Sequence, residues 1–280
     1  MSDRLSETNI GIGATRDLTL RVSIATLVKV LFENPKDGEI TLALERRATL
    51  REEGGRQFVE TKSQPFGGAI QIQDTRRLRN LIGSFHFDSE YARSEQDFRI
   101  FIPPLAWGQV RESCLQHLYH GNDAIIESLP VRELKEEFAE VLGVSLQPEQ
   151  YTYHPTGTVI EDHPSATDNF YARESLTVRI YRTFEARILD PSIANMLVIY
   201  SESITNEALQ QRVLLAAQNG QRGWVNAVQI LPLNAIRTFY KALSPGDRNQ
   251  PVSFQGHKLD ETVAAVLDNL NVPKYERILL

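Results

Sequence analysis

The sequence predicts an α/β protein, an α/β/α sandwich built on a mixed β-sheet. Apolar residues alternate with period two on both sides of one amphipathic helix, which indicates strands before and after that helix. Further helical patterns follow the later strands, as expected when helices cover a sheet. The chain has 280 residues, of which 41% are hydrophobic and 24% charged. A soluble chain of this length and composition can bury a substantial core.

Two strands and a tight turn open the predicted sheet. Residues 18–32 alternate and then become continuously apolar, and residues 39–47 form the partner strand. The connection between them contains Asp-Gly, a strong signal for a hairpin turn. Residues 49–57 are charged and contain glycines, so we expect a loop there. Residues 58–72 continue as a strand around a Gly-Gly turn.

The elements that follow the central helix are predicted from the same two periods. We expect strands at residues 151–160, 175–188, 195–201 and 224–231, and helices at 233–243 and 259–270. Pro245 marks a boundary between a main domain, residues 18–245, and a C-terminal linker with a short helix, residues 246–280.

The predicted helix at residues 129–142 is the most informative segment, because it gathers carboxylates on one face. At about 100° per residue, four glutamates share one arc and five apolar side chains share the opposite arc. They are Glu133, Glu136, Glu137 and Glu140 on the first, and Val131, Leu134, Phe138, Val141 and Leu142 on the second. Like charges three and four residues apart repel. The face is therefore either a solvated acidic surface or a set of ligands for a divalent cation, which prefers oxygen.

The run Arg132-Glu133-Leu134-Lys135-Glu136-Glu137 resembles the second half of the Nudix box, G-x5-E-x7-R-E-U-x-E-E-x-G-U, in which U is an apolar aliphatic residue. Upstream, residues 64–70 contain Gly67-Gly68 and resemble the turn and strand that run into that box. The resemblance implies a Nudix-like fold. It also implies hydrolysis of a nucleoside diphosphate linked to another moiety, with Mg²⁺ or Mn²⁺ as cofactor.

The resemblance implies roles for individual residues. Glu133, Glu136 and Glu137 would bind the metal, with Glu137 or Glu133 acting on the attacking water. Arg132 would hold these carboxylates in place as part of the catalytic set. Gly67 and Gly68 would let the backbone approach the box near the substrate.

Two arginines and three acids extend this candidate site. Arg46 and Arg47 end the second strand, where they would bind a substrate phosphate bidentately, although ordinary surface arginines explain them equally well. A further base from a later loop is common in the family, and Glu161, Asp162 and Glu202 are the candidates here.

The sequence departs from the family pattern at three places. The first Glu of the box falls on Ala124, with Asp123 and Glu127 nearby as replacements, and the glycine after the paired glutamates falls on Ala139. The spacing from Gly68 to Arg132 is also far longer than usual. We interpret residues 74–122 as an insertion.

The insertion contains a predicted strand at residues 97–102 and a predicted helix at 107–118. We expect it to form one wall of the substrate cleft, with Trp107 or Phe101 stacking on a base. The alternative is that it folds outward and makes a homodimer contact through Arg76, Arg77 and Arg79.

Composition narrows the remaining classes of function. A net charge of −6 argues against a surface that coats nucleic acid. A single cysteine, Cys114, rules out an internal disulfide framework and a multi-cysteine zinc site. No apolar run approaches the ~18 residues of a membrane span, so we expect a cytoplasmic protein. The resemblance to the Nudix box implies that it acts on a small nucleotide. Two alternatives stay open: an inactive Nudix-fold module that binds an ADP-ribose-like nucleotide for regulation, and an unrelated α/β protein.

Overall fold

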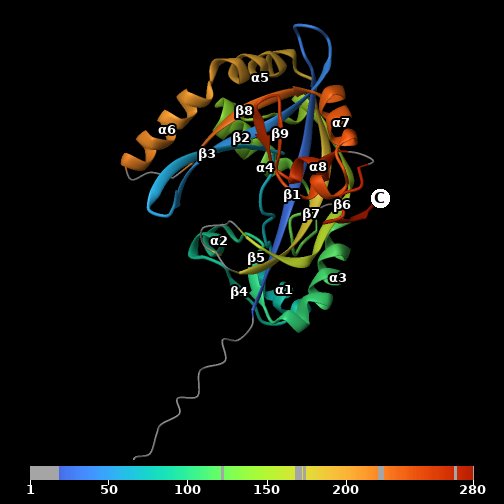
Figure 1. The fold of residues 1–280 in the computed structure, drawn as a ribbon. Coiled ribbons are helices and arrows are strands. Elements are labelled where there is room, and N and C mark those ends of the chain that lie inside the picture. Colours follow the sequence, from blue (N-terminus) through green and yellow to red (C-terminus); the bar gives the residue numbers. More distant parts are fainter. Residues whose placement is uncertain are drawn as a thin grey trace, which may run out of the picture.

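A computed structural model describes residues 19–120, 123–167, 172, 175–219, 224–267 and 270–279. These residues form a mixed α/β structure in which helices surround one curled, mixed sheet (Figure 1). None of the helices in these ranges is long and apolar enough to cross a membrane.

The strands of the described ranges belong to a single sheet with the path β11-β6-β7-β1-β2-β3-β10-β9. Their bounds are β1 Leu20–Glu33, β2 Ile40–Glu53, β3 Arg56–Gln64, β4 His86–Phe87, β5 Arg99–Ile102, β6 Tyr151–Ala166, β7 Leu176–Ile188, β8 Trp224–Pro232, β9 Val252–Phe254, β10 His257–Leu259 and β11 Glu276–Ile278. Off this path, β4 pairs with β5, β5 with β1, and β8 with β2.

The α-helices are α1 Thr75–Ile82, α2 Glu90–Glu95, α3 Trp107–Leu118, α4 Val131–Leu142, α5 Pro191–Ser203, α6 Asn206–Gln218, α7 Leu233–Ala242 and α8 Thr262–Val266. Short 3-10 turns lie at Pro104–Ala106, Pro148–Gln150 and Gly246–Asn249. Figure 1 shows α1, α2 and α3 gathered at one end of β1, and α5, α6 and α7 toward the other end.

The long strand β1 organises both faces of the sheet. It runs parallel to β7 over most of its length and antiparallel to β2 and β5 at its two ends. Because side chains alternate along a strand, Val28 and Val30 pack in the core that contains α4 and α5, whereas Leu27 and Leu31 pack in the core that contains α7 and α8. Helices therefore cover both faces, as the sandwich prediction requires.

The insertion predicted at residues 74–122 is part of the core. Leu78 of α1 and Val110 of α3 pack against Leu20, Val22 and Ile24 of β1 in one apolar cluster. The predicted helix at 107–118 matches α3, and the predicted strand at 97–102 matches β5, whereas α1 and α2 were not expected.

Three predictions between residues 49 and 201 are wrong. The strand expected at 58–72 ends at Gln64 as β3, and residues 66–72 make only isolated bridges to other segments. The loop expected at residues 49–57 is a hairpin, since β2 continues to Glu53 and Gly54-Gly55 turn into β3 with positive φ of 57° and 76°. The strand expected at 195–201 lies inside α5. Asp190 caps α5 and Pro191 opens it, and the buried Ile193 and Leu197 follow helical spacing, which the apolar run conceals.

The segment after Pro245 joins the main sheet. The turn region expected at 246–254 contains β9, and the helix expected at 259–270 is reduced to the short α8. β10 pairs with β3 and β11 with β6, while Val263 packs in the same core as Leu42 and Leu44 of β2.

Gly67 allows the chain to run close to β1, which predicts a large cost for any side chain there. Its φ is 135°, and a Cβ at this position would lie 2.9 Å from the carbonyl carbon of Thr26. Gly67→Ala should lower the free energy of unfolding in urea by at least about 2 kcal/mol. Gly108 in α3 has open space at its Cβ, so Gly108→Ala should instead stabilise the protein by about 0.5–1 kcal/mol. Equal effects of the two substitutions would contradict this account.

Candidate functional site

Helix α4 is fixed by its apolar side against the sheet. Leu134, Phe138, Val141 and Leu142 are buried in the core shared with β1 and α5. The rings of Phe138 and Phe66 lie 5.2 Å apart, so the helix contacts the segment just before the Gly-Gly turn. Gly143 ends the helix in a left-handed conformation, with φ of 69°. The glycine displaced from the expected position 139 therefore serves as the helix cap.

Two of the four glutamates on the acidic face of α4 are buried, whereas Glu136 and Glu140 are exposed. Glu133 and Glu137 are 5% and 9% exposed, whereas the side chain of Glu136 is 60% exposed. Two of the three predicted metal ligands thus lie in the protein interior, facing the sheet.

Glu133 lies directly against Gly68. A Cβ added at Gly68 would be 2.9 Å from the carboxyl carbon of Glu133, so the glycine makes room for this carboxylate. The neighbouring Gly67 instead faces the backbone of β1. The backbone of the Gly-Gly segment is held by β1, because Thr26 N–H donates to the Gly68 carbonyl at 2.9 Å.

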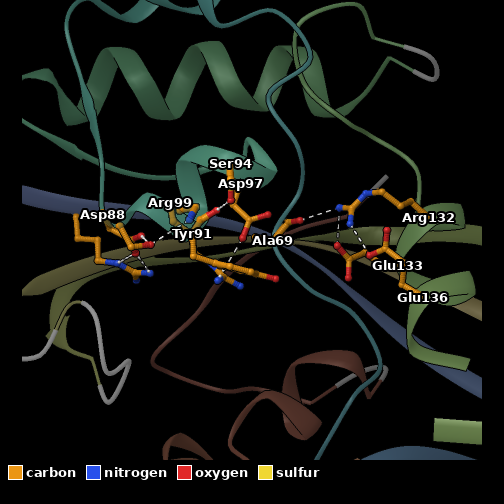
Figure 2. A network of polar contacts seen from close by, with 12 residues as sticks. Ala69, Asp88, Tyr91, Ser94, Asp97, Arg99, Arg132, Glu133 and Glu136 are labelled. Atoms are coloured by element: carbon orange, nitrogen blue, oxygen red, sulfur yellow. Dashed lines mark hydrogen bonds and ion pairs between the residues drawn. The ribbon is translucent and has the colours of Figure 1, made fainter. Parts of the chain in front are cut away.

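Arg132, at the start of α4, bonds to the Gly-Gly segment and to three carboxylates. Its guanidinium donates to the carbonyl of Ala69 at 2.9 Å, to Glu127 at 2.7 Å, to Glu133 at 2.5 Å and to Glu136 at 2.8 Å. Figure 2 shows Arg132 between Ala69 on one side and Glu133 and Glu136 on the other. The predicted positioning role of Arg132 agrees with these contacts.

Glu127, one of the two acids expected near the missing first Glu, pairs with Arg132. Its carboxylate also accepts from the backbone N–H of Gln71 at 3.2 Å. Glu127, which lies after the insertion, therefore contacts both the segment before the insertion and Arg132.

A second group of charges surrounds Glu137. Glu45 of β2 is fully buried and accepts from Arg47 at 2.8 Å and from Gln64 at 2.7 Å. The charges of Glu45 and Glu133 both act on Glu137, and Arg47 opposes them. One carboxylate oxygen of Glu137, Oε2, is buried and has no hydrogen-bond partner among the described residues.

The buried acids of α4 hold protons more tightly than free glutamate. Burial raises the pKa of Glu133 to about 7, with Arg132 opposing part of the shift. Burial and then the charge of Glu45 raise the pKa of Glu137 to about 9. For Arg132, burial favours a lower pKa, but Glu127, Glu133 and Glu136 outweigh it and raise the pKa.

The donor chemistry of this site suits a divalent cation. Glu133 and Glu137 present buried carboxylate oxygens, including the unpartnered Oε2 of Glu137, and hard cations prefer such ligands. The three carboxylates do not form a closed ligand set, because Arg132 pairs with both Glu133 and Glu136. Over the described ranges, no three His, Cys, Asp or Glu side chains are grouped closely enough to hold a metal ion as they stand.

A recess of about 470 Å³ opens beside the acidic face, at the N-terminus of α4. It is lined by Gln73, Asp123, Glu127, Ser128, Leu129, Val131, Arg132, Lys135 and Glu136. Ser128 is 5% exposed, and its hydroxyl has no partner within the described part of the chain. The ends of the insertion meet here, since Gln73 N–H donates to the Ile125 carbonyl at 2.8 Å.

Several predicted site residues lie elsewhere. Trp107 and Phe101 do not line the recess, and the Trp107 indole donates to Asp162 at 2.6 Å. Glu161 pairs with Arg179 at 2.7 Å, and Glu202 with Lys36. These contacts engage all three candidate bases away from α4.

Arg46 and Arg47 point to opposite faces of β2. Arg47 faces Glu45 and Glu137, whereas Arg46 donates to the Ile204 carbonyl at 2.9 Å and to Asn206. The two arginines therefore do not reach one site together, and only Arg47 lies beside the acids of α4. Sequence reasoning also missed Glu45, whose only signal was an acid that directly follows the apolar run Leu42-Ala43-Leu44.

Comparison with protein-family models, with curated proteins and with solved structures finds no match to this chain. The likeness to the Nudix box therefore rests on the residues of α4 and on their contacts with the Gly-Gly segment.

The raised pKa of Glu137 predicts a pH-dependent stability. In the unfolded chain this group ionises near pH 4.5, and in the folded chain near pH 9. Between these values the folded state retains a proton that the unfolded state loses, so stability falls as pH rises. Glu137→Gln should remove this loss and stabilise the cation-free protein at pH 8 by about 1–3 kcal/mol.

The measurement is urea unfolding in EDTA at pH 5 and pH 8. Glu112→Gln, which changes an exposed glutamate of α3, serves as the control and should not alter the difference between the two pH values. A Glu137→Gln variant as pH-sensitive as the parent protein would show that Glu137 is not the titrating group.

Proposed function

We propose that this chain is a Nudix-type hydrolase. It would require Mg²⁺ or Mn²⁺ and split a nucleoside diphosphate linked to another moiety, acting on a soluble substrate in the cytoplasm. The observation that carries the proposal is the contact between Glu133 and Gly68. Arg132 strengthens this contact, because its guanidinium donates to the carbonyl of the next residue, Ala69. It joins the two halves of the split motif in space, although an insertion separates them in sequence.

The order of elements supports the same proposal. A β1–β2 hairpin precedes the Gly-Gly segment, and α4 follows it on one face of a mixed sheet. In a Nudix-like fold, this arrangement places the carboxylates of the helix beside the glycine turn.

The chain's own residues would divide the work as follows. Glu133, Glu136 and Glu137 would hold the cation, which when bound neutralises phosphate charge and activates water. Glu133 or Glu137, the two buried carboxylates, would take the proton of the attacking water. Arg132 would keep Glu133 oriented, and Gly68, which has no side chain, would leave room for its carboxylate.

The recess at the start of α4 supports a substrate of nucleotide size. Its volume of about 470 Å³ lies within the range of small-molecule sites. It shares Arg132 and Glu136 with the acidic face, so a substrate whose phosphates lie at the carboxylates would extend one end into the recess.

A second candidate function is binding without cleavage. The engagement of Glu133 and Glu136 by Arg132, at 2.5 Å and 2.8 Å, favours it, because the guanidinium occupies two of the three carboxylates that would bind the cation. Such a module would bind an ADP-ribose-like nucleotide with an affinity that does not depend on Mg²⁺.

The decisive assay follows turnover of ADP-ribose, NADH, dinucleoside polyphosphates and nucleotide sugars with Mg²⁺. The parent protein should hydrolyse at least one of them at about 1 s⁻¹ or faster, and the Glu136→Gln/Glu137→Gln double variant should be inactive. Mg²⁺ should raise the melting temperature of the parent protein but not that of the variant. Binding of ADP-ribose with no hydrolysis above the variant's level would favour the second candidate.

Gly68→Ala tests the contact that carries the proposal. The added methyl group overlaps the Glu133 carboxylate and must displace it. We expect kcat to fall by about 100-fold, the effect of misplacing a catalytic group by about 1 Å, while the fold survives. Gly108→Ala, on the distant α3, should retain full kcat. Full activity in Gly68→Ala would show that the position of Glu133 does not affect the reaction.

A further inference from the structure

A small polar recess lies on the face of β2 opposite the carboxylate site. Its volume is about 90 Å³, and it is lined by Arg46, Thr61, Ser63, Asn206, Gly256, His257 and Lys258. These residues come from β2, β3, the first turn of α6, the β9–β10 turn and β10. Most of these elements are far apart in sequence. No carboxylate is among the lining residues.

The lining contains buried donors that lack acceptors. Arg46 is 4% exposed, and its Nε–H has no hydrogen-bond partner among the residues that the structure describes. The buried hydroxyl of Thr61 is also unpartnered in that part of the chain. Each such group costs about 1–3 kcal/mol if it stays unsatisfied, so a bound water or ion is the usual explanation.

The charges around the recess select an anion. Arg46 and Lys258 supply two cations, and Thr61, Asn206 and His257 add neutral groups able to donate hydrogen bonds. Burial and then the charge of Arg46 lower the pKa of His257, so its imidazole is neutral at pH 7. Two carboxylates lie outside the lining: Glu60 pairs with Lys258 at 2.5 Å, and Glu207 acts on Arg46.

The size of the recess limits the ligand. It is well below the ~300 Å³ of sites that enclose a nucleotide, and holds about three waters at ~30 Å³ each. A tetrahedral oxyanion with several acceptor oxygens satisfies many donors in that space.

We propose that this recess binds one phosphate group and thereby ties the start of α6 to β2 and β3. Arg46 already reaches α6 through Asn206 and the Ile204 carbonyl, and the anion would complete the same junction. The site is independent of the proposed hydrolase activity, because its residues lie on the other face of β2 from Glu45 and Arg47.

Calorimetry with inorganic phosphate and, separately, AMP tests the proposal in EDTA, with chloride at the same ionic strength as reference. Thr61→Val, which removes the hydroxyl but keeps the shape, and Lys258→Gln should each weaken binding by about tenfold. Arg56→Gln, on an exposed residue of the same strand β3, removes a positive charge and should leave affinity unchanged.

The two ligands distinguish the source of the phosphate. Binding of phosphate alone identifies a free anion, and tighter binding of AMP through the same residues identifies the end of a phosphate ester. The proposal fails if neither ligand binds better than chloride, or if Thr61→Val and Lys258→Gln both bind like the parent protein. The Glu136→Gln/Glu137→Gln variant should bind phosphate normally, so an inactive hydrolase and an absent phosphate site give different results.

Discussion

The guanidinium of Arg132 is the interaction on which the candidate site depends. Its planar group donates at once to the Ala69 carbonyl and to Glu127, Glu133 and Glu136. It therefore joins the Gly-Gly segment, the residues just after the insertion, and α4. A lysine, with one rotatable ammonium, does not reproduce this geometry. Without Arg132, Glu133 would be a buried carboxylate with no cation beside it, which is among the costliest arrangements in a protein interior.

The carboxylates of the site carry more negative charge than the neighbouring arginines neutralise. Arg132 and Arg47 together face Glu45, Glu127, Glu133, Glu136 and Glu137. Burial, and then the charges of neighbouring carboxylates, raise the pKa values of Glu133 and Glu137, and the two cations do not offset this rise. Active sites are where natural proteins tolerate such a cost. The acidity thus supports a binding or catalytic role more strongly than a structural one.

The sequence was sufficient where local periodicity decides the structure. The apolar stripe of α4 and the strands β1, β6, β7 and β8 follow from helical and alternating patterns. It was misleading at residues 195–201, where a continuous apolar run fits a strand or a buried helix equally well. The burial of Glu133 and Glu137 depends on where the Gly-Gly segment and β2 pack, and no spacing along the chain encodes that.

Arg46 and Arg47 illustrate the same limit at one position. Once β2 is known to be a strand, adjacent side chains must point to opposite faces. The pair then divides between two sites: Arg47 beside the acids of α4, and Arg46 in the small recess next to α6. The site that each arginine joins depends on the face of β2 to which its side chain points. Only the sheet topology shows what lies on each face.

The insertion shows why a split motif can still assemble. Its two ends are bridged by the pairing of Ile72 with Ile126, and Glu127 N–H donates to the Gln71 carbonyl at 2.8 Å. The entropic cost of closing a loop grows only with the logarithm of its length, about 0.6 kcal/mol for each doubling. The inserted residues also bury their own apolar side chains against β1. Arg132 therefore contacts the Gly-Gly segment as it would if a short connection joined the two. The length of the inserted chain has little effect on the geometry of the carboxylates.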